Sequence, residues 1–362
     1  MPRPIFDSHL DLAWSACSFN RDLTLSVDEI RRRESHMTDE RSRGRSVLSL
    51  PELRAAGVAC CVGTLLARGG PAQSPQPTYK RTDLDHANPT LAYAAAHEQL
   101  AWYRLLESQG HLRMIRTPSE LDAHWTAYGA DPGHTPLGLI LSMEGTDPIV
   151  TPDHVHEWHA AGLRAAGLAH YGRGQHAYGT GVDGPLSAAG IEVLRTMDDV
   201  GMILDVTHLS DQSMAQALEY FDGPVLASHH NCRALVPGDR QLTDEQIKQI
   251  VSRGGVIGAA LDAWMLYPNW IRGQTQPEVV TLAALADHID HVCQLAGNAS
   301  HAALGTDLDG GFGNEQTPID LRTYRDSQKL ADILATRGYP TADIDAIFHT
   351  NWLAFFRKHL PK

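Results

Sequence analysis

The sequence predicts an α/β fold, a (β/α)8 TIM barrel of parallel strands with extra helices at its C-terminus. Short apolar runs bounded by glycine, proline or polar residues alternate with amphipathic stretches, which is typical of βα units around a parallel sheet. Eight such runs can be counted, the number that a closed barrel of this type needs. The GxGxxG sequence of a dinucleotide-binding sheet is absent after the first run. Strand counting alone leaves an open doubly wound sheet as the alternative.

The predicted strands, in order, are residues 5–10, 57–66, 137–143, 163–169, 202–207, 224–228, 255–261 and 302–306. Residues 24–49 are polar and charged, and predict a helix and a loop before the second strand. Residues 68–89 are rich in glycine, proline, glutamine and threonine, which indicates a long loop. Residues 314–360 predict two or three helices, ending in the amphipathic AIFHTNWLAFFRKHL. Barrels of ~200 to over 400 residues fold as one unit, so we expect a single domain over residues 1–362.

Composition and charge narrow the classes of partner. The net charge is −13 and there is no long basic run, which argues against nucleic acid or an anionic membrane surface as partner. No run reaches the ~18 apolar residues of a membrane-spanning helix, and no apolar leader precedes the first strand. The 5 cysteines are scattered without a CxxC pair, so we expect reduced, buried thiols. We therefore expect a cytoplasmic protein that binds neither nucleic acid nor membrane.

Ionisable side chains mark the ends of six predicted strands. Because strand C-termini of a barrel converge on one mouth, where active sites of this fold lie, we expect these side chains to share one pocket. A lone histidine at a strand end is more often a capping or core residue, and an HxD pair alone is a weak signal. Six matched strand ends together favour a metal site, because charged groups are rarely buried without partners. In strand order, the residues are His9 and Asp11, Glu144, His170, His208, His229 and Asp307.

The types of side chain fit a site for two zinc ions. His9 and Asp11 are two residues apart, so they lie on the same face of a strand and can chelate one ion. His208 and His229, from neighbouring strands, can hold a second ion, and Glu144 can give one carboxylate oxygen to each. Two ions about 3.5–4 Å apart would share a water, deprotonate it near neutral pH and clamp a tetrahedral intermediate.

Other reactive side chains receive structural interpretations. His230 follows His229 and points the opposite way on a strand, which favours a structural role. His154, His156 and His159 lie on the predicted helix after the third strand and are expected at the surface. The cysteines lie away from the strand ends or within a strand, so nothing supports a nucleophilic cysteine.

These motifs resemble those of the membrane (renal) dipeptidase family of metallopeptidases, within the amidohydrolase-like barrels. The resemblance runs from FDSHLDL to ALGTDLDGG and is densest in GPLSAAGIEVLRTMDDVGMILDVTHLS, followed by GPVLASHHNCRAL. It implies a two-zinc hydrolase that cleaves the amide bond of dipeptides by attack of a metal-bridging hydroxide. Glu144 stands in place of the carbamylated lysine of related hydrolases. The zinc ligands implied are His9, Asp11 and Glu144 for one ion, and Glu144, His208 and His229 for the other.

The resemblance also implies catalytic and binding roles beside the bridging Glu144. His170 matches the histidine that contacts the substrate and stabilises the tetrahedral oxyanion. Arg240, in VPGDRQLTDEQI, matches the arginine that grips the terminal carboxylate, a task that suits a bidentate guanidinium. Asp307 matches the aspartate proposed to take a proton from the bridging water and pass it to the leaving amine. Asp309, two residues on, is expected to order its loop.

Two departures from the family leave substrate preference open. The sequences EGTD at residues 144–147 and LDAW at residues 261–264 differ from the patterns of relatives close to the predicted mouth. Bacterial members favour dipeptides, often with a D-residue at the C-terminal side, and some act on N-acyl amino acids. An N-acyl-amino-acid hydrolase, another amidohydrolase such as a lactonase, and a non-hydrolytic member are therefore the alternatives. The expected partner is a small dipeptide-like substrate, and a homodimer is left open.

Overall fold

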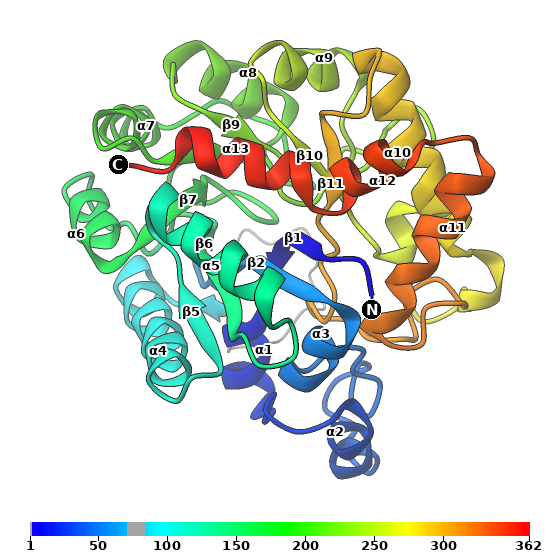
Figure 1. The fold of residues 1–362 in the computed structure, drawn as a ribbon. Helices are drawn as coiled ribbons and strands as arrows, with labels where there is room; N and C mark the ends of the chain where they lie inside the picture. Colours follow the sequence, from blue (N-terminus) through cyan, green and yellow to red (C-terminus); the bar gives the residue numbers. More distant parts are fainter. Residues whose placement is uncertain (1, 71–83) are drawn as a thin grey trace.

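The strands of the computed structural model, which describes residues 2–70 and 84–362, lie inside a ring of helices (Figure 1). Six of them form one parallel ladder in the order β1 (Ile5–Leu10), β2 (Val58–Leu66), β6 (Leu137–Glu144), β7 (Leu163–Gly167), β8 (Ile203–Asp205) and β9 (Val225–Leu226). A separate parallel pair consists of β10 (Ile257–Ala259) and β11 (Ala302–Leu304).

Isolated backbone contacts join the pair to the ladder on both sides. A parallel bridge between Ala227 and Ile257 connects the end of β9 to β10. On the other side, the amide of Asp307 donates a hydrogen bond of 3.3 Å to the carbonyl of His9, which places the end of β11 beside β1. The eight strands therefore follow one another around a TIM-barrel-like ring, as the sequence predicts.

All eight predicted strands are present, and the differences lie at their ends. Each of the last five ends two residues before its predicted end, because the chain turns into the mouth of the barrel. Three short strands were not predicted, and one of them, β5 (Leu112–Met114), pairs with the first half of β6 and is too short to show a period of two. In the predicted loop 68–89, β3 (Arg68–Gly69) pairs with β4 (Asp85–His86), and residues 71–83 lie outside the described part of the chain.

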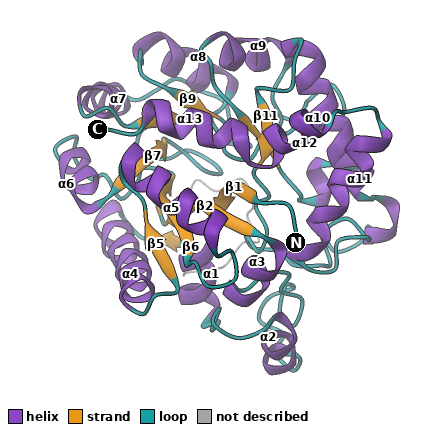
Figure 2. Cartoon of the chain, in the orientation of Figure 1, coloured by secondary structure: helices purple, strands orange, loops and turns teal. Residues whose placement is uncertain are grey.

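Helices cover the outside of the strands (Figure 2). Local side-chain contacts and glycine define several helix ends. Thr117 with Glu120 forms a capping box at the start of α5, and Thr243 with Gln246 forms one at the start of α9. Gly162 ends α6 in the left-handed conformation. Within the described ranges, no helix has the length and apolar character needed to cross a membrane. The helices up to β11 are α1 (Leu12–Phe19), α2 (Val27–Glu34), α3 (Leu50–Ala56), α4 (Pro89–Ser108), α5 (Pro118–Ala130), α6 (His154–Ala161), α7 (Ala188–Asp199), α8 (Asp211–Tyr220), α9 (Asp244–Ser252), the 3-10 turns η2 (Ala263–Met265) and η3 (Pro277–Val279), and α10 (Leu282–Ala296).

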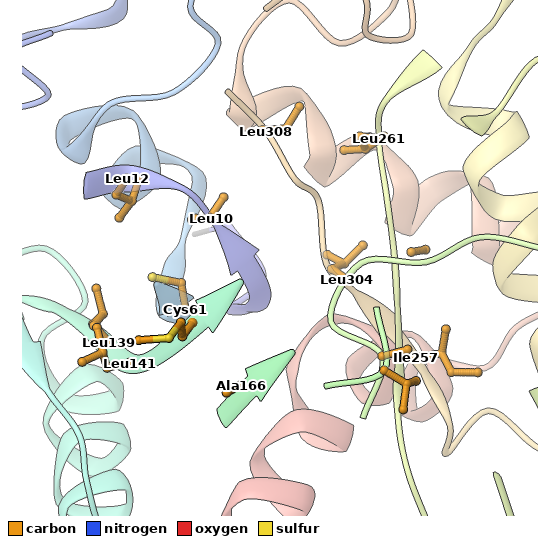
Figure 3. Packing of buried hydrophobic residues seen from close by; sticks show 14 of the residues in the cluster. Leu10, Leu12, Cys61, Leu139, Leu141, Ala166, Ile257, Leu261, Leu304 and Leu308 are labelled. Atoms are coloured by element: carbon orange, nitrogen blue, oxygen red, sulfur yellow. The ribbon is translucent and has the colours of Figure 1, made fainter. Parts of the chain in front are cut away.

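Buried side chains alternate between two apolar clusters along the strands. In β6, Leu139 and Leu141 belong to the cluster shown in Figure 3, which packs the strands against the helices, together with Cys61 of β2. Ile140, between the two leucines, belongs to a second cluster with Cys60, which gathers residues from β strands all around the ring. This alternation follows from the two-residue period of a strand and fills the interior of the barrel with side chains.

The predicted C-terminal helices close the end of the barrel opposite the mouth. The indole of Trp352 donates a hydrogen bond of 2.9 Å to the carbonyl of Leu304, and Phe356 stacks on Phe6 at the start of β1 with ring centroids 5.3 Å apart. The chain after β11 comprises η4 (Tyr324–Gln328), α11 (Lys329–Thr336), α12 (Thr341–Asp345), the π-helical turn η5 (Ala346–Thr350) and α13 (Asn351–His359). Figure 1 shows α13 lying across the strands.

Candidate metal centre

The predicted site residues meet at the C-terminal ends of the strands. His9 lies within β1 and Glu144 is the last residue of β6, whereas the others lie in the turns that follow their strands. They surround a cavity of about 290 Å³, which also receives the side chain of Arg240. The predicted residues that line this cavity are Asp11, Glu144, His170, His208, His229, Arg240 and Asp307, with His9 directly behind them.

Glu144 occupies the centre of the cluster. Its Oε1 atom lies 3.1 Å from Nε2 of His208 and 3.2 Å from Nε2 of His229. Its Oε2 atom lies 3.6 Å from Nε2 of His9, and Nε2 of His170 lies 4.0 Å from Oε1. One carboxylate therefore faces histidines from four different strands, and its two oxygens face different partners.

A second group of possible ligand atoms lies on the β1 side of Glu144. Nε2 of His9 is 3.6 Å from Oδ2 of Asp11 and 3.8 Å from Oδ1 of Asp307. The ligand atoms of His9, Asp11 and Asp307 all lie within 4.8 Å of one another. The same limit holds for His9, Glu144 and His229, and for Glu144, His170 and His208.

Hydroxyl groups orient the rings of two histidines. Thr180 Oγ1 lies 2.9 Å from Nδ1 of His208, and Ser228 Oγ lies 2.9 Å from Nδ1 of His229. With Nδ1 engaged, each ring turns its Nε2 toward Glu144. The hydroxyl of Thr64 contacts the carboxylate of Asp11 in the same way. Such outer contacts fix the direction of metal ligands.

The turns that carry the ligands depend on two buried carboxylates that the sequence analysis did not single out. Oδ1 of Asp205 accepts hydrogen bonds of 3.0 Å from the amides of Thr207 and Ser228, which ties the turn before His208 to the strand before His229. Oδ1 of Asp7 likewise accepts from the amides of His9 at 3.1 Å and Thr306 at 2.9 Å.

Two predicted site residues adopt a backbone conformation that side chains other than glycine rarely take. His208 has φ 67° and Asp307 has φ 59°, both in the left-handed region. Such conformations cost of order 1–3 kcal/mol and persist only where the surroundings enforce them, most often at functional sites. Both side chains line the cavity; for His208 the turn changes the face, because Leu204 and Val206, four and two residues before it, belong to the cluster that packs against the helices.

Burial and charge set the protonation of the cluster. Burial, with the charge of Arg240, holds the pKa of His208 and of His170 well below the ordinary value, so both rings are neutral and can offer a lone pair. Burial opposes the charged form of His9 as well, but the carboxylates of Glu144 and Asp11 outweigh it and raise its pKa well above the ordinary value.

Burial also shifts the pKa of the carboxylates, in the upward direction that favours their neutral form. Burial raises the pKa of Glu144, and it raises the pKa of Asp307 well above the ordinary value. Several acidic groups thus share a buried site with too little positive charge. Within the described part of the chain, Nε2 of His9 and Oε1 of Glu144 also lack a hydrogen-bond partner. Neutral imidazoles, carboxylates and unsatisfied buried atoms that converge on one point form a donor set that fits divalent cations.

Arg240 lies at the edge of this cluster. Its guanidinium is almost fully buried, with 1% of the residue exposed, and Nη2 donates a hydrogen bond of 3.1 Å to the carbonyl of His229. Nη1 has no hydrogen-bond partner among the described residues. A buried guanidinium with a free N–H at a cavity wall can bind an anionic group of a ligand.

Several residues that line the cavity were not predicted as site residues. Asp262 and Trp264 belong to the LDAW sequence noted as a departure from the family, and that departure was the available signal. The rest come from loops whose course no periodic pattern reveals. The main unpredicted lining residues are Trp14, Tyr171, Asp262, Trp264, Trp270, Phe312 and Gln316.

The residues that were assigned structural roles lie outside the cavity. Asp309 accepts a hydrogen bond of 2.9 Å from the amide of Val47 and one from the hydroxyl of Ser46, so it orders the neighbouring loop. His230 is buried and does not line the cavity. The histidines of residues 154–159 lie on α6, on the outside of the barrel.

A parallel barrel with a cluster of histidines and carboxylates at its mouth is typical of a metal-dependent enzyme. A sequence model described as "Membrane dipeptidase (Peptidase family M19)" matches residues 2–359. The chain therefore belongs to the membrane dipeptidase family, a family of metallopeptidases, and its resemblance to that family is confirmed.

Relatives and solved structures agree with this assignment. An uncharacterised protein from the pqqA 5' region of Klebsiella pneumoniae is 29% identical over 60% of this chain and 80% of its own length. Dipeptidase tcpJ of Claviceps purpurea is 28% identical to this chain. The match covers 56% of this chain and only 46% of the fungal protein.

Two solved structures share the fold over nearly the whole chain. The structure of a family M19 metallopeptidase, dipeptidase AC, has a TM-score of 0.79 at 21% identity, with 99% of each chain covered. A metallopeptidase of Rhodobacter sphaeroides, solved with a phosphinate mimic of the dipeptide L-Ala-D-Ala, has a TM-score of 0.78 at 20% identity, with 100% of each chain covered.

Proposed function

We propose that this protein is a two-zinc dipeptidase that hydrolyses dipeptides with a free C-terminal carboxylate, including those with a D-residue at that end. The observation that carries the proposal is the position of Glu144, whose two oxygens face two separate groups of ligand atoms. A carboxylate placed in this way can bind two cations at once. Nitrogen and oxygen ligands of this kind suit zinc, which leaves part of its coordination open when protein ligands are few.

The proposed ligand sets are the ones that the resemblance implies. Two bound divalent ions would supply Lewis-acid polarisation of the scissile carbonyl and a water of lowered pKa. The hydroxyls of Thr180 and Ser228 would keep the ligating rings in place. The five proposed ligands are His9, Asp11 and Glu144 for one ion, and Glu144, His208 and His229 for the other.

Three further side chains would act on the substrate itself. Arg240 would bind the terminal carboxylate through its free Nη1. His170, neutral because burial lowers its pKa, would lie beside the carbonyl oxygen and stabilise the charge that develops there. Asp307, 3.8 Å from His9, would receive the proton of the attacking water and pass it to the leaving amine.

The stereochemical part of the proposal rests on the relatives. The metallopeptidase of Rhodobacter sphaeroides was solved with a mimic of L-Ala-D-Ala, and the fungal relative is named a dipeptidase. We extend this preference to the present chain. A cytoplasmic location, a single domain and a possible homodimer also stay predictions.

The test combines metal analysis with a substrate panel. Protein purified without chelator is analysed for zinc and assayed on L-Ala-D-Ala, L-Ala-L-Ala and N-acetyl-alanine. We expect about two zinc ions per chain on the two-metal scheme, and hydrolysis of at least one dipeptide that chelator abolishes. Hydrolysis of N-acetyl-alanine alone would instead identify an N-acyl-amino-acid hydrolase. Full activity with one ion or none would contradict the two-zinc proposal.

A further inference from the structure

We propose that the cavity selects dipeptides whose C-terminal residue carries a bulky aromatic side chain, and that Asp262 sets this preference by holding Trp264 in the cavity wall. The inference rests on the proposed function and narrows its substrate class. It is drawn from side chains of the cavity wall that are neither proposed metal ligands nor Arg240, which is the proposed anchor of the terminal carboxylate.

Aromatic side chains line the cavity beside the metal cluster, and Tyr171 contacts two of the histidines, with ring centroids 4.8 Å from His170 and 5.0 Å from His208. These aromatic residues come from α1, from the turns after β7 and β10, and from the loop after β11, so segments far apart in the sequence supply one surface. Flat aromatic faces pack favourably against another ring and bury 150–250 Å² each, on the order of what a substrate ring would need. The aromatic lining residues are Trp14, Tyr171, Trp264, Trp270 and Phe312.

Trp264 is held in this wall by a buried hydrogen-bond network. Its indole Nε1 donates to Oδ2 of Asp262 at 2.7 Å. The amide group of Gln316 donates to both oxygens of the same carboxylate, at 2.9 and 3.1 Å, and the carbonyl of Gln316 accepts from the amide of Ala263 at 2.9 Å. Both oxygens of Asp262 are thus engaged within the protein, so Asp262 is a positioning residue and Trp264 meets the substrate.

The aromatic wall is attached to the carboxylate anchor. Gln241, the residue after Arg240, donates from Nε2 to the carbonyl of Met265 at 2.9 Å. Nδ2 of Asn231 lies 3.3 Å from the same carbonyl, which follows Trp264 directly. Arg240 and Trp264 are therefore fixed on one rigid unit. A substrate residue whose carboxylate lies at Arg240 would turn its side chain toward Trp264, and that residue is the C-terminal one.

The other arginines of the cavity do not favour an acidic side chain. Arg68 forms an ion pair with Asp85, with Nε to Oδ1 at 2.6 Å. Arg272 is exposed and donates to the carbonyl of Gly311 at 2.9 Å. The ion pair with Asp85 already neutralises Arg68, and the solvent around the exposed Arg272 weakens any pairing with a second substrate carboxylate. Among the described lining residues, we therefore assign the selection of the side chain to the aromatic surface.

The test compares two dipeptides on the zinc-loaded enzyme, Ala-Phe and Ala-Ala, each with a C-terminal residue of the configuration that is hydrolysed faster. We expect kcat/KM to be about 10-fold or more higher for Ala-Phe, and Trp264→Ala to remove most of this preference. Trp264→Phe should keep most of it. The half-buried Trp102 of α4, outside the cavity, provides the control: Trp102→Ala should leave the ratio unchanged. The ratio cancels any loss of correctly folded enzyme.

Asp262→Asn tests the positioning role. Whichever way the new amide turns, its NH2 group faces a donor, the Trp264 indole or the Gln316 amide, so the preference should fall through a higher KM for Ala-Phe rather than a lower kcat. An enzyme that hydrolyses both dipeptides equally well, or a preference that survives Trp264→Ala, would overturn the inference and leave the proposed function intact. Failure to hydrolyse any dipeptide with zinc bound would contradict the proposed function instead.

Discussion

The substitution Glu144→Gln removes the central feature of the site at little steric cost. The change replaces one carboxylate oxygen by an NH2 group and removes the negative charge. Oε1 of Glu144 lies 3.1 and 3.2 Å from Nε2 of His208 and His229, and Oε2 lies 3.6 Å from Nε2 of His9. Whichever position the NH2 group takes, one set of ligands loses its shared oxygen. We expect zinc to fall from two ions to one or fewer per chain.

The loss should be visible in thermal unfolding. A metal present at about 100–1,000 times its Kd stabilises the native state by about 2.7–4.1 kcal/mol. With an unfolding entropy of about 2.1 cal/mol/K per residue, the 362-residue chain should lose about 4–5 °C in Tm for each ion, and about 8–10 °C when chelator removes both ions from wild type. The chelator-induced shift in Glu144→Gln should be less than about half of that. The metal-free variant should be at least as stable as metal-free wild type, because a neutral amide costs less to bury than a carboxylate without a cation.

The measurement is differential scanning calorimetry with and without chelator, alongside zinc analysis of the same samples. The matched control is Glu192→Gln, which makes the same chemical change at an exposed position of α7 and should show the full wild-type shift. Two zinc ions in Glu144→Gln, with an unchanged shift on chelation, would refute the assignment of Glu144 as the shared ligand.

Three further predictions concern catalysis. Arg240→Lys should lower kcat/KM for free dipeptides by about 100-fold, since the bidentate fork is lost, and should affect dipeptide amides little; equal losses on both would indicate a folding role. Asp307→Asn should keep both zinc ions while kcat falls by about 10²–10⁴-fold, as expected for general acid–base catalysis, whereas loss of an ion would identify Asp307 as a ligand. Burial raises the pKa of Asp262 to about 6 against the opposing charge of Arg272, so the Ala-Phe to Ala-Ala ratio of kcat/KM should fall as pH drops through that value. Protonation removes an acceptor for the Trp264 indole, and a ratio independent of pH would contradict this reasoning.

The fold and the clustering of these histidines and carboxylates could be predicted from the sequence because one geometric rule connects them. In a parallel barrel, strand ends meet at one mouth, so a histidine or carboxylate at the end of each apolar run is placed near the others without any knowledge of the loops. Glu144, His208 and His229 come from three different strands, yet their ligand atoms lie within 3.3 Å of a neighbour in the cluster. The cavity walls follow no such rule, because Trp264, Trp270 and other wall residues lie in loops whose course depends on tertiary contacts.

The same loops explain why the strands end early. The prediction extended each of the last five strands by two residues, which are apolar or small and continue the alternating pattern. In the structure, a buried carboxylate replaces the backbone hydrogen bonds of the strand ladder at two places where neighbouring strands end. Asp205 bonds the amides of Thr207 and Ser228, and Asp7 bonds those of His9 and Thr306.

A side chain that satisfies backbone amides frees the chain from the straight course that a ladder imposes. The turn after Asp205 can therefore pass through the left-handed conformation at His208, and the segment after Thr306 does the same at Asp307. In both places the residue in the left-handed conformation lines the cavity. A strand that continued with regular hydrogen bonds would place His208 on the face of Leu204 and Val206, which pack toward the helices. The early end of β8 is thus a requirement of the proposed site, because the turn that replaces the ladder is what brings His208 to within 3.1 Å of Glu144.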